Sequence, residues 1–145
     1  MKRSSDSPII LLLSRVISPY IMLFGLYVIF HGHYSPGGGF QGGAMLAASI
    51  LLIRIAVEEK VYEMQFKKSF DIPLGALGVL IFFGVGLIAM VLGGNFLDYH
   101  FLPMSWLEPA DIRSMGILLI EIGVGLAVMT ILVAIYDNLL EDEDA

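Results

Sequence analysis

The chain has 145 residues, of which 57% are hydrophobic and only 15% are charged, and its formal net charge at pH 7 is −6. Soluble domains carry roughly 25% charged residues, so this composition indicates a protein of the lipid bilayer and nothing in it points to nucleic acid. The absence of cysteine excludes disulfides, thiolate metal sites and the ligands of an iron–sulfur cluster. Any redox cofactor would belong to a partner chain.

Four apolar segments are long enough to cross a bilayer, which requires about 20 residues each. They run over residues 8–30, 42–57, 72–92 and 112–136. This pattern predicts an all-α integral membrane protein, with one transmembrane domain over residues 1–145. The second segment is the shortest, so we expect its helix to extend back into the glycine-rich run before it. The first segment is too long for a cleavable signal and is expected to remain as a helix.

The positive charges in the connections indicate the orientation, because lysine and arginine favour the cytoplasmic side of a membrane. Lys2 and Arg3 precede the first segment, and Lys60, Lys67 and Lys68 lie between the second and the third. The glycine-rich connection has neither residue type. The distribution therefore predicts that both termini are cytoplasmic.

The first connection, HGHYSPGGGFQGG at residues 31–43, is the most unusual stretch of the chain. A turn between membrane helices must satisfy its backbone polar groups with protein or trapped water, and glycine lets backbone approach other backbone or an ion closely. A Walker loop would need lysine and then serine or threonine after the last glycine, and a dinucleotide fingerprint would need a preceding strand, so neither fits. The structural motif comprises Pro36, Gly37, Gly38, Gly39, Phe40, Gly42 and Gly43.

The two histidines of this connection, His31 and His33, are candidates for an ion or proton path. The remaining histidine, His100, lies in a different connection, so the three do not have the spacing of a metal-ligand set and we predict no metal site. Two roles stay open. Imidazole titrates near neutral pH and relays protons, and the same rings could equally act as donors that fix the glycine turn.

One acid, Glu121, interrupts the fourth apolar segment nine residues after Ile112. That spacing places it about 13 Å along a helix, within the hydrocarbon, where an ionisable group is expensive and marks a functional site by default. Hydrocarbon favours the protonated carboxyl unless a cation or donor pairs with it. Glu121 is therefore a candidate carrier of a proton or cation, or else a structural carboxylate that joins two helices. Gly125, one turn later, is expected to leave room for water or a partner side chain.

Pairs of small residues recur at close spacing along all four segments, which lets helices approach closely in lipid. The pairs are Ser14 and Ser18, Gly43 and Ala47, Gly75 and Gly78, and Gly123 and Ala127. With little chain outside the membrane, these contacts favour a subunit of a larger assembly. The sequence offers no pairing of nucleophile and base and no cofactor motif, so we predict a transporter subunit and not an enzyme.

Three stretches together carry a family resemblance: HGHYSPGGGFQGG at residues 31–43, GGNFL at 93–97 and SMGILLIEIGVGLAV at 114–128. They resemble the MrpB, or MnhB, subunit of the multi-subunit cation/proton antiporters, a family with relatives in the membrane arms of ion-pumping hydrogenases and sulfur-reducing complexes. The resemblance spans nearly the whole chain.

The resemblance implies a multi-pass subunit of a Na⁺/H⁺ antiporter in the cell membrane, packed beside other subunits and binding no cofactor itself. It also implies that the glycine motif and Glu121 are the family positions, with Glu121 as a proton or cation carrier and His31 and His33 as relays or turn anchors. Two alternatives remain: a subunit of the ion-pumping arm of a redox complex, and a purely structural subunit.

Overall fold

The computed structural model describes residues 7–34, 37–57 and 68–143. Its long helices are α1 (Pro8–Phe30), α2 (Gly39–Ala56), α4 (Asp71–Val91) and α5 (Pro109–Glu143). Two single turns of 3₁₀ helix flank α4: η1 (Lys68–Phe70) before it and η2 (Tyr99–Phe101) after it. These described ranges contain no strand, which confirms the all-α prediction.

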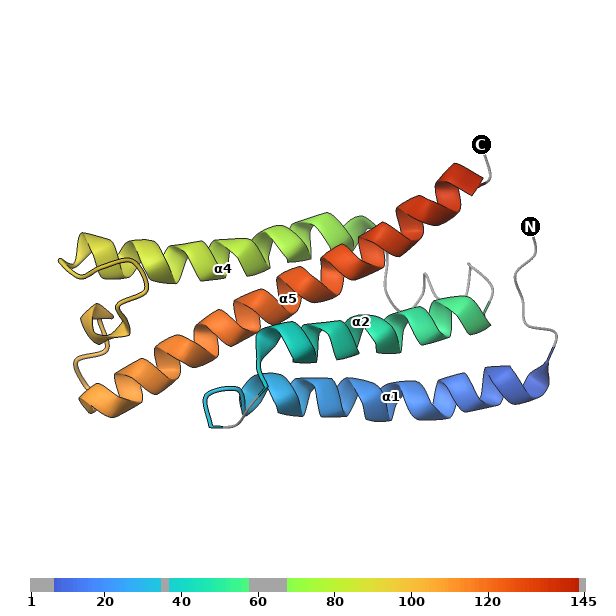
Figure 1. Cartoon of the computed structure of the whole chain (residues 1–145), viewed down its shortest axis with the longest axis horizontal. Coiled ribbons are helices and arrows are strands. Elements are labelled where there is room, and N and C mark those ends of the chain that lie inside the picture. Colours follow the sequence, from blue (N-terminus) through green and yellow to red (C-terminus); the bar gives the residue numbers. More distant parts are fainter. Residues whose placement is uncertain (1–6, 35–36, 58–67, 144–145) are drawn as a thin grey trace.

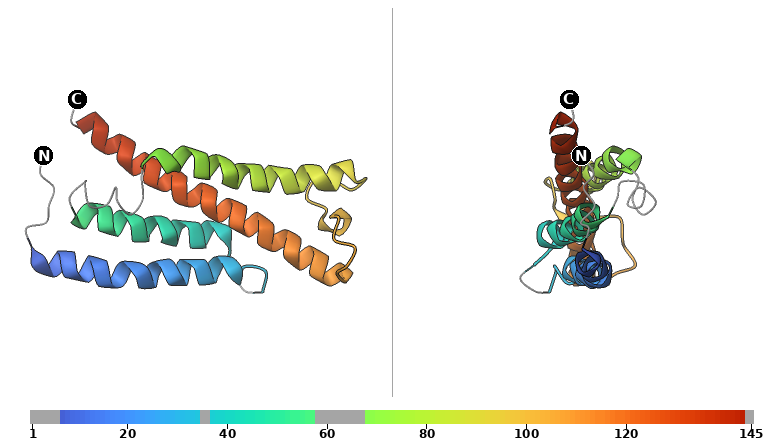
Figure 2. Two further views of the ribbon diagram at one scale, coloured as in Figure 1. Left: turned by 180° about the vertical axis from the view of Figure 1, so that it is seen from behind. Right: turned by 90° about the vertical axis from the view of Figure 1, so that its right-hand side faces the viewer.

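The four long helices form an elongated bundle in which α5 runs diagonally between α4 on one side and α2 on the other (Figure 1). Helix α5 packs against both α2 and α4, whereas α1 packs mainly against α2. The views in Figure 2 show that α1 begins, and α5 ends, at the same end of the bundle. A chain that crosses a membrane an even number of times has this arrangement.

All four helices are long and apolar enough to cross a membrane, judged by length and composition. Helix α2 begins at Gly39, so it recruits part of the glycine run, as expected from its short apolar segment. Helix α5 is longer than its apolar segment at both ends. It begins at Pro109, and proline is well suited to the first turn because that turn does not use its N–H.

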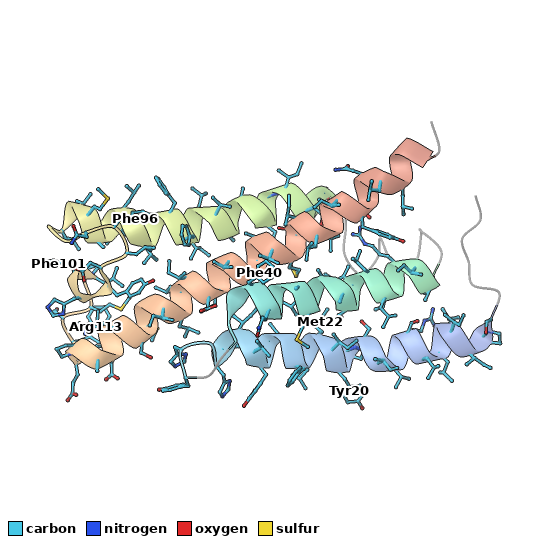
Figure 3. All side chains as sticks on the ribbon, in the orientation of Figure 1. Tyr20, Met22, Phe40, Phe96, Phe101 and Arg113 are labelled. Atoms are coloured by element: carbon cyan, nitrogen blue, oxygen red, sulfur yellow. The ribbon has the colours of Figure 1, made fainter. Side chains whose placement is uncertain are left out.

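The outer faces of the helices present large apolar side chains that no part of the described chain covers. Tyr20 of α1 is 70% exposed and points away from the rest of the bundle (Figure 3). On α4, Val91 is 83% exposed. Such surfaces are suited to lipid or to the helices of other subunits.

Glycines make the closest contacts between helices. A methyl group at Gly43 of α2 would lie 2.6 Å from the carbonyl oxygen of Gly125 in α5, and one at Gly123 would lie 2.8 Å from the carbonyl oxygen of Gly78 in α4. These helices therefore touch backbone to backbone, which confirms the packing expected from the small residues.

Serines join α1 to α2 by reciprocal hydrogen bonds. The Ser18 hydroxyl donates to the carbonyl oxygen of Ser49 over 2.9 Å, and the Ser49 hydroxyl donates to that of Ser18 over 3.1 Å. Both side chains are buried. The buried apolar core beside them comes from α1, α2 and α5 and comprises Ile29, Leu46, Ala47, Met129 and Val133.

Candidate functional site

The carboxylate of Glu121 in α5 lies at the start of α2. The first N–H groups of a helix have no partner inside the helix, and Gly38, the N-cap residue of α2, has no side chain to accept from them. Instead, the Gly39 N–H donates a hydrogen bond to Oε2 of Glu121. The positive end of the α2 dipole also favours a negative charge at this place. Glu121 thus caps α2 from a different helix.

Three glycines make room for this carboxylate. Gly38 has a φ of +136°, which L side chains rarely adopt, and a methyl group there would lie 2.7 Å from Oε1 of Glu121. A methyl group at Gly39 would overlap the backbone carbonyl of Glu121, and one at Gly32 would lie 2.8 Å from the Cα of Gly38. A side chain at Gly38 would meet the carboxylate, one at Gly39 would meet the backbone of α5, and one at Gly32 would meet the backbone of Gly38. The three glycines therefore let Glu121 approach the start of α2 closely.

A cleft of about 410 Å³ adjoins the carboxylate. Residues 37–41 line it from the start of α2, and Ile120, Glu121 and Val124 line it from α5. Phe40 is 68% exposed and lies where α2 begins beside α5 (Figure 3). A carboxylate at the wall of an open cleft is chemically suited to exchange a proton or a hard cation.

His31 and His33 come directly before and after Gly32, whose backbone adjoins Glu121. The His31 ring stacks on Tyr27 with a centroid distance of 4.0 Å, and its Nδ1 lies 3.0 Å from the Tyr27 carbonyl oxygen. The His33 ring packs against Tyr34 at 3.9 Å, and its Nδ1 is buried without a hydrogen-bond partner in the described part of the chain. The contact of His31 with α1 fits a turn anchor, and the relay role stays a prediction for both rings.

No group of three histidine, cysteine, aspartate or glutamate side chains that could hold a metal ion occurs in residues 7–34, 37–57 and 68–143. Of the predicted motif, Pro36 lies outside the described residues. Gly42 and Gly43 belong to the helix contacts, since a methyl group at Gly42 would lie 2.6 Å from the Gly25 carbonyl oxygen.

The expectation that Gly125 leaves room for water or a partner side chain is wrong. A methyl group at Gly125 would lie 2.7 Å from Cδ1 of Ile29 and 3.4 Å from the carbonyl oxygen of Gly39. Helices α1 and α2 therefore fill that space. The open volume beside Glu121 is on the side of Ile120 and Val124.

Tyr99 of η2 is a neighbour of the site that the sequence does not reveal. Its ring packs on α5 at Gly116, where a methyl group would lie 2.7 Å from Cδ1 of the tyrosine. Burial, followed by the negative charge of Glu121, raises the pKa of the Tyr99 hydroxyl. In the sequence alone, such a residue cannot be distinguished from an ordinary interfacial aromatic.

A second charged contact between α2 and α5 lies at the other end of α2. Arg54 in the last turn of α2 forms an ion pair with Asp137, and the two side chains are only 1% and 6% exposed. A cation there also complements the negative end of the helix dipole. The separations in sequence, 82 residues for Gly39 and Glu121 and 83 for Arg54 and Asp137, show that α2 and α5 run parallel in one register.

With this geometry in place, comparison with known proteins decides the family. The family model for the domain related to the MnhB subunit of Na⁺/H⁺ antiporter matches residues 9–134. The chain belongs to the MnhB family. The resemblance inferred from the three sequence stretches is thereby confirmed.

Several MnhB relatives are similar along most of this chain. A Na⁺/H⁺ antiporter subunit of Bacillus subtilis is 31% identical over 123 residues, which cover 80% of this chain and 85% of that protein. The subunit of the same name from Alkalihalophilus pseudofirmus is 30% identical over 137 residues, or 89% and 94% of the two chains. An uncharacterized protein of Methanocaldococcus jannaschii is 34% identical over 128 residues. That match covers 85% of this chain and 48% of the relative, so the chain spans about half of its length.

A solved structure has the same fold. It is a chain of the membrane-bound sulfane sulfur reductase, an archaeal respiratory membrane complex, with a TM-score of 0.65 and 31% sequence identity. The match covers 96% of this MnhB-family chain and 62% of that chain. The four-helix arrangement is therefore one that occurs inside a larger membrane complex.

Proposed function

We propose that the chain is an integral subunit of a multi-subunit Na⁺/H⁺ antiporter in the cell membrane, and that Glu121 exchanges protons or Na⁺ with the cleft beside it. The observation that carries this proposal is the carboxylate of Glu121, inside a membrane-spanning helix and at the wall of a cleft of about 410 Å³. An acid in that position is a functional site by default. The identity of the ions, Na⁺ and H⁺, is inferred from relatives that are named as subunits of a Na⁺/H⁺ antiporter.

In this proposal, other subunits cover part of the apolar outer faces of the bundle and lipid covers the rest. Both termini lie on the cytoplasmic side, which agrees with the shared end of α1 and α5 (Figure 1) and with the lysines and arginines of the sequence. The chain contributes ion transport and binds no cofactor of its own.

The similarity to a chain of the sulfane sulfur reductase favours one second candidate. In that candidate the same chain is part of the ion-pumping membrane arm of a redox complex, and the redox chemistry belongs to partner chains. The role of Glu121 would be the same in both assemblies. A purely structural subunit is the third possibility, since Glu121 also caps α2.

Purification of the chain from its native membrane in mild detergent, followed by mass spectrometry, tests the assembly. Large antiporter-like membrane subunits alone would support the antiporter. Iron–sulfur or nickel-binding chains among the copurified proteins would transfer the chain to a redox-driven pump. Recovery of the chain without any partner would refute its assignment as a subunit.

A further inference from the structure

The carboxylate of Glu121 has two tasks that compete with each other. Its Oε2 accepts the hydrogen bond from the Gly39 N–H, and the same side chain lines the cleft from which an ion would arrive. A hydrogen bond to an ionised carboxylate is about twice as strong as one to a neutral group, and a helix dipole attracts only the ionised form. Any cation that neutralises Glu121 therefore weakens both its hydrogen bond to the Gly39 N–H and its attraction to the dipole of α2.

We propose that a cation bound at Glu121, either H⁺ or Na⁺, releases the first turn of α2, so that occupancy of the ion site is coupled to the conformation of the glycine motif. This inference rests on the proposed function of Glu121 and adds a structural consequence to it. A carboxylate that only carries ions, or only caps a helix, would not produce this coupling.

The start of α2 can respond because, in the part of the chain that the structure describes, it has no second side-chain cap. Gly38 supplies no side chain, and the structure shows no side-chain hydrogen bond to this end of the helix other than that of Glu121 among the described residues. Further along, α2 is fixed by the hydrogen bonds between Ser49 and Ser18 and by the pairing of Arg54 with Asp137. The release is therefore confined to the first turn.

Among the described residues, few other titratable groups lie near this carboxylate. The remaining cleft-lining residues of α2 and α5 have no ionisable side chain. Tyr99 of η2 packs on α5 at Gly116, and burial, followed by the charge of Glu121, raises the pKa of its hydroxyl. His31 and His33 flank Gly32, whose backbone adjoins Glu121. The histidines are thus the other ionisable groups beside this carboxylate, and a variant of Glu121 separates their effect from that of the carboxylate.

Hydrogen exchange in the intact complex, analysed by mass spectrometry, measures the release directly. The readout is the exchange rate of the amides in residues 39–42, with Na⁺ or with choline at fixed pH, and then over a pH series without Na⁺. Residues 92–98, in the connection after α4, correct for the intrinsic effect of pH on exchange. We expect Na⁺ or acid to accelerate exchange in residues 39–42 about tenfold, the scale of one charge-assisted hydrogen bond. A response to Na⁺ at fixed pH assigns the competition to Na⁺, and a response to pH alone assigns it to H⁺.

Two matched variants complete the test. Glu121→Gln removes the charge but keeps a hydrogen-bond acceptor, and is expected to abolish the response to both ions. Asp111→Asn removes an acid from the exposed first turn of the same helix and is expected to retain it. If Glu121→Gln does not assemble, Glu121→Asp takes its place. It keeps the charge on a shorter side chain, so it should respond to ions from a faster basal rate, and its failure to respond would count against the coupling.

The results that would overturn the coupling differ from the result that would overturn the proposed function. If residues 39–42 exchange at one rate under all conditions while the complex still exchanges Na⁺ for H⁺, the coupling is wrong and the transport role remains. A response that persists in Glu121→Gln assigns the effect to another group, such as the histidines, and also overturns the coupling. Full ion exchange in assembled Glu121→Gln overturns the proposed role of Glu121 itself.

Discussion

The ion pair of Arg54 and Asp137 makes a quantitative prediction about how α5 is held to α2. Both side chains are almost completely buried, with 1% and 6% exposure. Replacement of Asp137 by alanine removes the carboxylate and leaves the guanidinium in the interior without it. The loss of one partner of a buried ion pair costs about 3–5 kcal/mol. About 1.4 kcal/mol corresponds to a tenfold change. We therefore expect Asp137→Ala to lower the ratio of folded to unfolded chain by roughly two to three and a half powers of ten.

The double variant Arg54→Met, Asp137→Leu distinguishes a buried pair from two independent charges. Replacement of both members by apolar residues of similar size is about neutral or stabilising. The double variant should therefore recover most of the stability lost in Asp137→Ala. Denaturant unfolding of the purified chain in detergent gives these free energies, with Asp111→Asn as the exposed control on α5.

Two results would refute this reasoning. One is a loss below about 1 kcal/mol for Asp137→Ala, the size expected of an exposed pair. The other is a double variant whose loss equals the sum of the losses measured for Arg54→Met alone and Asp137→Leu alone, since additivity means that the two sites do not interact.

The remaining predictions concern helix packing and Tyr99. Gly43→Ala should destabilise the chain by about 1–3 kcal/mol, because a methyl group there would lie 2.6 Å from backbone of α5 and overpacking has this cost. Gly84→Ala should be neutral or stabilising by up to about 1 kcal/mol in the same denaturant unfolding assay, since no neighbouring atom of the described chain would lie within 4 Å of a methyl group there. Ser18→Ala and Ser49→Ala should each cost about 0.6 kcal/mol, the average for such bonds in membranes, and a double-mutant cycle that shows no coupling would contradict the bonding. The pKa of Tyr99 is raised above 10.0 in the folded chain, so its contribution to stability is present below pH 10 and lost as pH rises through the folded value. Tyr99→Phe should lack that alkaline loss in a pH series of unfolding measurements.

Hydropathy alone was sufficient to predict most of the helices. Helix α1 covers Pro8–Phe30 as the apolar run predicts, and α4 begins and ends one residue earlier than its segment. Helix α2 begins at Gly39 because a carboxylate from α5 caps it there. That tertiary contact leaves no trace in the local sequence.

The candidate site was predictable in part. Glu121 is visible as an acid in an apolar segment, but its partner is a backbone N–H, which every residue except proline possesses. The pairing of Arg54 with Asp137 requires the parallel register of α2 and α5, which hydropathy does not contain. The expectation for Gly125 failed for a related reason, because a glycine leaves space only where no neighbouring helix fills it.

The exchange of ions by Glu121 can be measured as ion flux through the assembled complex. Inverted membrane vesicles with an imposed proton gradient would report Na⁺-dependent proton exchange for the wild type, Glu121→Gln and the control Asp111→Asn, each checked for assembly. We predict that Glu121→Gln assembles but loses the exchange, whereas Asp111→Asn retains it. Exchange at the wild-type rate in assembled Glu121→Gln would contradict the account and leave Glu121 as a structural cap of α2.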